Sequence, residues 1–348
     1  LIRLGAACIA EAGVIVKWIP RGDAFAANAV AMLAGIAPEK PDPAVRYGTL
    51  PNGLRYALRA NAEPKQRASL RLLIEAGSLH ETEDQRGLAH FLEHMAFNGS
   101  EHYAPGTLVE FFQRMGMNFG GDTNASTGFD RTLYLLELPE TSEATLAEGL
   151  RVFGDYASGL LLAPAEIDRE RGIIMSEKRA RDNVVFRTAV AQFEFMLGDT
   201  LLPRRMPIGV AEVIQGAPRE RFVSFWDRWY RPENAVVVMA GDMEPAKLAN
   251  LVQKYFNDWK DVGPRAPEPP FGDPSPQGTP VRVLIEPTLP TTVSIAYLRP
   301  WRKVNDTIAY NEQLLVDALA LQIVNRRLEV QARNGGNYLF AQIAPEDI

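Results

Sequence analysis

The sequence has very little cysteine and histidine. Its 348 residues include one cysteine, Cys8, and four histidines. A single thiol excludes a disulfide within the chain and also excludes a metal site built from several thiolates. The net charge is −6, and no block of lysine and arginine interrupts the sequence. This balance argues against binding to nucleic acid, so we expect no nucleic-acid partner.

Long hydrophobic runs are missing as well. No stretch reaches the roughly 20 apolar residues that a membrane span needs, so we expect none in this chain. Residues 1–40 are moderately apolar, and Ala24-Phe25-Ala26 resembles a small-residue cleavage site. One interpretation of this segment is a partial export signal, and the alternative is a leader without function. The chain begins with leucine and stops just after a strand-like run, so we expect it to be a piece of a longer protein.

The histidines that are present form the most informative pattern. His90 and His94 lie four residues apart with Glu93 between them, in the order H-x-x-E-H. On a helix, positions i and i+4 share a face, so both imidazoles can reach one ion. Apolar residues surround the motif and predict a buried helix, in which unpaired polar groups are costly. A metal ion would supply the missing partner. The alternative is two ordinary histidines on a helix.

A third ligand has to come from elsewhere in the chain. Zinc in hydrolases usually binds three protein side chains and a water, and neither His80 nor His102 is well placed. Pro164 predicts the start of a helix that carries Glu166, Glu170 and Glu177 on one face. These residues are candidates for a carboxylate ligand. The alternative is a solvated acidic face.

The order of the predicted elements indicates an α+β fold. Strands and helices do not alternate regularly, which favours a mostly antiparallel sheet packed against helices. The strands are expected at 55–59, 69–75, 131–138 and 235–240, and the main helices at 142–162, 164–182, 186–197, 219–230 and 245–259.

The length of the chain and a proline-rich segment indicate two domains. We expect a leader over 1–43, a metal-binding domain over 44–262, a linker over 263–280 and the start of a second, truncated domain of similar fold over 281–348. The second domain has no histidine and should be non-catalytic. Its predicted elements are strands at 281–286 and 292–298, a helix at 305–333 and a strand at 338–343.

Two segments resemble the insulinase/pitrilysin family of zinc metallopeptidases. The run GLAHFLEHMAF at 87–97 is similar to the family's motif helix, and DRERGIIMSE at 168–177 resembles its distal glutamate segment. The resemblance implies one Zn²⁺ per catalytic domain, bound by His90, His94 and Glu177, with Glu170 supporting a ligand. The spacing from His94 to Glu177 is a few residues longer than in the family pattern, so Glu170 is the alternative ligand.

The same resemblance implies a fold like that of the mitochondrial processing peptidase and a mechanism. Glu93 would act as the general base on a water activated by zinc. The run GDTNAST at 121–127 resembles the strand along which family members bind an extended substrate, with Asn124 and Ala125 as expected main-chain contacts.

We therefore expect a zinc-dependent endopeptidase that acts on extended peptides or unfolded protein segments. Closing its chamber would need a C-terminal half or a partner subunit. Similarity to large bacterial members favours a periplasmic or secreted location, and a cytoplasmic one stays open. The alternatives are a non-catalytic scaffold or processing-complex subunit of the same fold, and a zinc hydrolase with a non-peptide substrate.

Overall fold

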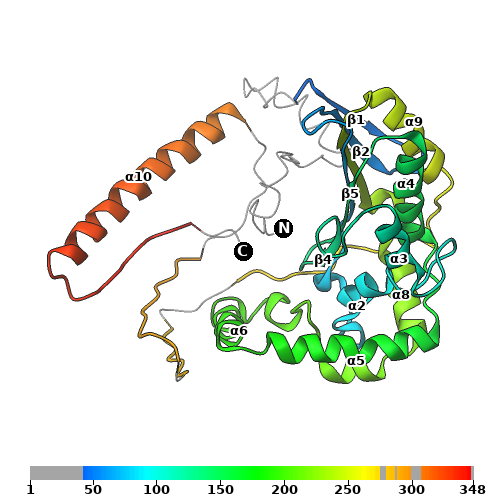
Figure 1. Cartoon of the computed structure of the whole chain (residues 1–348). Coiled ribbons are helices and arrows are strands. Elements are labelled where there is room, and N and C mark those ends of the chain that lie inside the picture. The colour runs from blue at the N-terminus through cyan, green and yellow to red at the C-terminus, as the bar shows by residue number, and fades with distance from the viewer. Residues whose placement is uncertain (1–41, 275–279, 287, 299–306, 346–348) are drawn as a thin grey trace. The chain divides into compact units, whose positions relative to one another are not determined.

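A computed structural model describes residues 42–274, 280–286, 288–298 and 307–345 (Figure 1). The expected leader over 1–43 therefore lies almost entirely outside the described residues. Contacts divide the chain into two units, one of Pro43–Pro300 and the other of Leu1–Asp42 with Trp301–Ile348. Among the described residues, no helix has both the length and the apolar composition needed to cross a membrane.

The larger unit is built on one six-stranded sheet. Its strands lie in the order β1-β2-β6-β3-β5-β4, and only the pair β2 and β6 is parallel. The expected mostly antiparallel sheet is therefore confirmed. The strands are β1 (Val45–Thr49), β2 (Arg55–Ala60), β3 (Ala68–Ile74), β4 (Thr123–Thr127), β5 (Thr132–Leu138) and β6 (Ala235–Gly241).

Alternation along the strands explains why helices cover one face of this sheet. In β3 and β5 every second residue is buried, as expected when one face carries the core. Helices α4 and α9 contact each other and lie against this sheet (Figure 1). The helices of this unit are α2 (Leu88–Met95), α3 (Thr107–Arg114), α4 (Glu143–Ser158), α5 (Pro164–Arg181), α6 (Val184–Leu197), α7 (Ala211–Gly216), α8 (Arg219–Trp229) and α9 (Pro245–Phe256).

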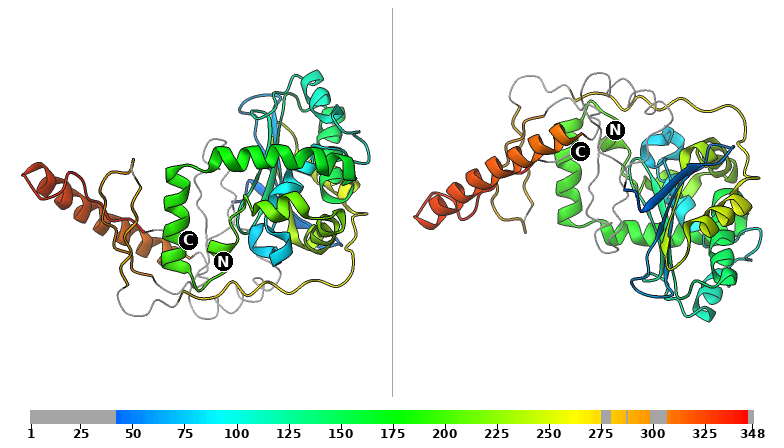
Figure 2. Two further views of the ribbon diagram at one scale, coloured as in Figure 1. Left: turned by 90° about the horizontal axis from the view of Figure 1, so that it is seen from below. Right: turned by 90° about the horizontal axis from the view of Figure 1, so that it is seen from above.

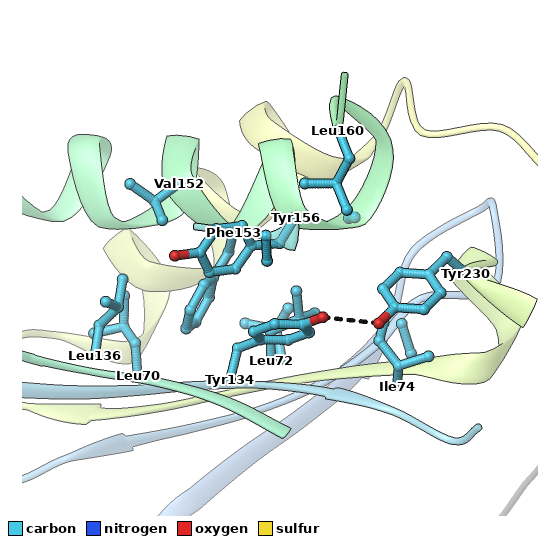
Figure 3. Packing of buried hydrophobic residues seen from close by; sticks show 14 of the residues in the cluster. Leu70, Leu72, Ile74, Tyr134, Leu136, Val152, Phe153, Tyr156, Leu160 and Tyr230 are labelled. Carbon is cyan, nitrogen blue, oxygen red and sulfur yellow. Dashed lines mark hydrogen bonds between the residues drawn. The ribbon is translucent and has the colours of Figure 1, made fainter. Parts of the chain in front are cut away.

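Aromatic side chains fill the core between α4 and the sheet (Figure 3). Tyr134 of β5 packs against Tyr156 of α4 with ring centroids 4.9 Å apart, and both rings are fully buried. The Tyr134 hydroxyl lies 2.8 Å from that of Tyr230, so these two buried hydroxyls are polar partners of each other (Figure 3). This core fixes β5 and, through it, the edge strand β4.

Helix α5 begins at Pro164, as the sequence predicts, and contacts α2. Figure 2 shows α5 as a straight rod from which α6 turns away sharply. The contact between α5 and α2 brings two segments about 80 residues apart in the chain to one place, and it positions the candidate site.

The expected strands at 281–286 and 292–298 are not strands in the described part of the chain. All their side chains except those of Glu286 and Leu298 are exposed, and no neighbouring strand pairs with these segments there. A strand needs a partner for its backbone groups, and alternation in sequence alone does not provide one.

The described part of the smaller unit is dominated by α10 (Ile308–Arg333), which matches the helix predicted at 305–333. Thr307 caps it by accepting a hydrogen bond from the Tyr310 amide. No strand is assigned at 338–343, contrary to expectation. The domain boundaries expected from the sequence remain a prediction.

Candidate metal centre

Helix α2 is held in place at its start by glycine and by a buried carboxylate. Gly87 precedes the helix with φ of 103°, and a Cβ there would lie 2.8 Å from the Cα of Gly209. Only glycine allows both this conformation and this close approach. The carboxyl group of Glu81 accepts hydrogen bonds from the amides of Gly87 and Ala89, each at 2.9 Å. These amides are among those that a helix start leaves unpaired.

The structure brings both histidines and Glu177 together. Glu177 Oε2 lies 3.6 Å from His90 Nε2 and 3.4 Å from His94 Nε2. The three ligand atoms all lie within 4.8 Å of one another. In a tetrahedral zinc site with bonds of about 2.0–2.2 Å, ligand atoms are about 3.3–3.6 Å apart. The residues present thus fit one zinc ion.

Glu170 has a different position from Glu177 although both lie on α5. Its Oε1 lies 2.8 Å from Nδ1 of His94, and its side chain is buried. A carboxylate at Nδ1 favours the tautomer with the proton on Nδ1, which leaves the Nε2 lone pair for a metal. The Nδ1 atom of His90 is buried and has no such partner among the described residues.

Burial and nearby charges set the protonation of the two imidazoles. Burial, with the charges of His94 and Arg181, lowers the pKa of His90 to about 3, so His90 is neutral and can act as a ligand. Burial alone would also lower the pKa of His94, but the hydrogen bond to Glu170 and the surrounding carboxylates outweigh it. The pKa of His94 is therefore raised, and a proton competes with a metal at this residue.

Glu93 is buried beside the candidate ligands and is not among the three residues whose ligand atoms cluster. Its Oε2 accepts a hydrogen bond of 2.5 Å from the Thr127 hydroxyl at the end of β4. Burial raises the pKa of Glu93, while the Thr127 bond opposes that rise. A carboxylate with a raised pKa and one fixed oxygen is suited to accept and return a proton near neutral pH.

Strand β4 is the last strand of the sheet beside this carboxylate, and its one strand partner among the described residues is β5. A bridge to Phe119 covers the outer edge at Thr123, and beyond it the edge is open. The amide of Glu137 donates to the Asp122 carbonyl, so Asp122, Asn124 and every second residue face β5. The backbone of Ala125 therefore faces the open edge, as expected for a main-chain contact.

The backbone of Asn124 faces the neighbouring strand, contrary to expectation. Its side chain lies at the edge instead, accepting from the Ala125 amide at 2.9 Å and donating to the Gly120 carbonyl at 3.3 Å.

The sequence reasoning missed three contributors to the site: Asn98, Thr127 and Arg181. The guanidinium of Arg181 lies 2.5 Å from Glu177 Oε1, one turn along α5. The i to i+4 spacing of Glu177 and Arg181 on a helix could have predicted this ion pair from the sequence. The contacts of the other two residues depend on tertiary packing.

Comparisons with known proteins identify the family of this chain. The family model for insulinase, peptidase family M16, matches residues 56–192, and the model for the M16 inactive domain matches residues 217–333. The chain therefore belongs to the insulinase family of peptidases.

Particular relatives are zinc proteases. The chain is 31% identical over 325 residues to the probable zinc protease PqqL of Escherichia coli, covering 90% of this chain and 34% of that protein. It is 30% identical over 308 residues to the PqqL of Haemophilus influenzae, covering 84% of this chain and 32% of the relative. The crystal structure of the first half of the E. coli periplasmic protease PqqL superimposes with a TM-score of 0.73 at 28% identity, covering 88% of this chain and 65% of that one. The chain thus spans about a third of the length of these curated relatives.

Proposed function

We propose that this chain is the metal-binding part of a zinc-dependent endopeptidase that cleaves extended peptides or unfolded protein segments. The observation that carries the proposal is the convergence of His90 Nε2, His94 Nε2 and Glu177 Oε2 beside the buried Glu93. Family membership supports it, because the relatives are zinc proteases.

His90, His94 and Glu177 would hold one Zn²⁺. The chemistry that zinc supplies when bound is Lewis-acid polarisation of a water and of the scissile carbonyl. Glu93 accepts the proton of the attacking water and later delivers it to the leaving amine. Thr127 holds one oxygen of Glu93, so the other oxygen is available for that proton. Glu170 keeps His94 oriented through Nδ1.

The open edge of β4 supports an extended substrate. Ala125 presents its backbone there, and a peptide could add as a further strand, which recognises the main chain more than the side chains. The side-chain oxygen of Asn124 accepts a hydrogen bond from the Ala125 N–H, and the Asn124 side chain would contribute a further contact to the substrate.

The chain would work as part of a larger assembly. Because it spans about a third of the curated relatives, we infer that a further part of the protein or a partner subunit closes the substrate chamber. The proposed organisation keeps the peptidase domain at 44–262, the linker at 263–280 and a second, non-catalytic domain from 281. A periplasmic location is proposed because the structurally similar PqqL is described as periplasmic.

The test is hydrolysis of an unfolded casein substrate and quenched peptides, with and without a zinc chelator. Wild type should lose activity with chelator and regain it with zinc. Glu93→Gln should abolish hydrolysis while zinc remains bound, and Glu110→Gln, at an exposed position on α3, should behave as wild type. Hydrolysis by Glu93→Gln at the wild-type rate would refute the assignment of the base. A protein that purifies without stoichiometric zinc and does not take it up would instead support the non-catalytic subunit.

A further inference from the structure

We infer that Asn98 is a positioning residue of the metal site. It holds Glu170 in the orientation in which the carboxylate accepts the hydrogen bond from His94 Nδ1. This inference rests on the proposed zinc site and deepens it. Asn98 lies just after α2, outside the H-x-x-E-H motif, and touches none of the three candidate ligand atoms.

The side-chain amide of Asn98 contacts both members of the Glu170–His94 pair. Its Nδ2 donates to Glu170 Oε2 at 3.0 Å and to the His94 carbonyl at 3.1 Å. Helix α2 ends at Met95, and the chain turns so that the Asn98 side chain folds back over the last helical turn. One amide group therefore contacts both the helix that carries His94 and the carboxylate that faces its ring.

The direction of the amide is set by a second partner. Asn98 Oδ1 accepts from Arg169 at 3.4 Å, and this places the oxygen toward the guanidinium and the nitrogen toward Glu170. With the opposite direction, the amide oxygen would face the carboxylate and the bond would be lost. One chain of hydrogen bonds thus leads from Arg169 through Asn98 and Glu170 to the imidazole of His94.

Both oxygens of Glu170 are used in this chain. Oε1 faces His94 Nδ1 and Oε2 faces Asn98, and the residue is 4% exposed. Without Asn98, one buried carboxylate oxygen loses its donor, and the carboxylate can rotate away from the imidazole. Side chains that orient a metal-binding histidine typically account for 10–100-fold in metal affinity when removed.

If Asn98 acted only through the stability of the fold, its substitution would lower stability without a specific loss of zinc affinity. The bond from Asn98 to the His94 carbonyl also helps to end α2, so a substitution could act through stability alone. Asn52 supplies a matched control, because its Nδ2 donates to two backbone carbonyls, those of Phe256 at 2.7 Å and Trp259 at 3.0 Å. It lies in the same unit and does not touch the metal site.

The experiment measures zinc affinity of the whole chain by competition with a chromogenic chelator, together with the visible spectrum of the cobalt-loaded protein. Asn98→Leu keeps the size of the side chain and removes the donor. Asn98→Asp keeps the shape and places a carboxylate against Glu170. Both should bind zinc 10–100-fold more weakly and alter the cobalt spectrum, whereas Asn52→Leu should lower the unfolding midpoint and leave zinc affinity and spectrum unchanged.

Unchanged zinc affinity in both Asn98 variants would overturn the inference while leaving the proposed zinc site intact. An equal loss of affinity in Asn52→Leu would also overturn it, because the effect would then follow stability. Failure of wild type to bind zinc would refute the proposed function itself, so the two failures are distinguishable.

Discussion

Replacing Thr127 with valine removes the hydrogen bond that the Thr127 hydroxyl donates to the Glu93 carboxylate, and the size of the effect follows from that bond. The Thr127 hydroxyl donates to Glu93 Oε2 at 2.5 Å from the end of β4. A hydrogen bond to a charged group contributes about 1.5–3 kcal/mol. If that bond aligns the base in the transition state, its loss lowers kcat about 10–100-fold, since about 1.4 kcal/mol corresponds to tenfold.

The same substitution should move the pH dependence. The hydrogen bond from Thr127 lowers the pKa of Glu93, against the raising effect of burial. Without it the pKa rises further, and a smaller fraction of Glu93 is ionised at a given pH. The acidic limb of the pH–rate profile should therefore shift to higher pH.

The assay compares kcat, KM and zinc content for Thr127→Val, Thr127→Ser and wild type on a quenched peptide. Serine keeps the hydroxyl and should retain most of the activity, and zinc content should be the same in all three. Ser126→Ala changes an exposed neighbour on β4 and serves as the control. A Thr127→Val enzyme with the wild-type kcat and the wild-type acidic limb would show that Thr127 does not align Glu93.

The remaining predictions concern the third ligand and a buried carboxyl group. Glu177→Gln should weaken zinc binding at least 100-fold, while Glu110→Gln, at an exposed position on α3, should not change it. Zinc binding by Glu177→Gln at wild-type strength would contradict the ligand assignment. Burial raises the pKa of Glu81 from its ordinary value of 4.5 to about 8. Between these two values the folded chain keeps a proton on Glu81 that the unfolded chain has released. The free energy of unfolding, measured by denaturant titration, should therefore fall as the pH rises from about 5 to 8. Glu81→Gln should remove this pH dependence. The same pH dependence in Glu81→Gln and wild type would show that Glu81 is ionised when folded.

The features that the sequence could predict are local in the chain. His90 and His94 share a helical turn, and Pro164 marks the start of α5, so helical periodicity alone places Glu170 and Glu177 on one side. The buried pattern of β3 and β5 likewise follows from alternation within each segment. These inferences needed no knowledge of which elements touch.

The features that the sequence could not predict depend on which distant segments pack together and on the register between strands. Thr127 reaches Glu93 across 34 residues, and Asn98 reaches Glu170 across 72. Which of Asn124 and Ala125 turns its backbone to the open edge depends on the register of β4 against β5, and a shift of one residue would exchange them. The strands expected at 281–286 and 292–298 are not formed in the described part of the chain for a related reason, because alternation predicts a strand but does not supply its neighbour.

The most direct test of the account is a crystal structure of the zinc-loaded chain with anomalous data at the zinc edge. The account predicts one peak at about 2.0–2.2 Å from His90 Nε2, His94 Nε2 and Glu177 Oε2, with Glu170 at Nδ1 of His94. A peak bound by Glu170 in place of Glu177, or no zinc between the two histidines, would contradict it.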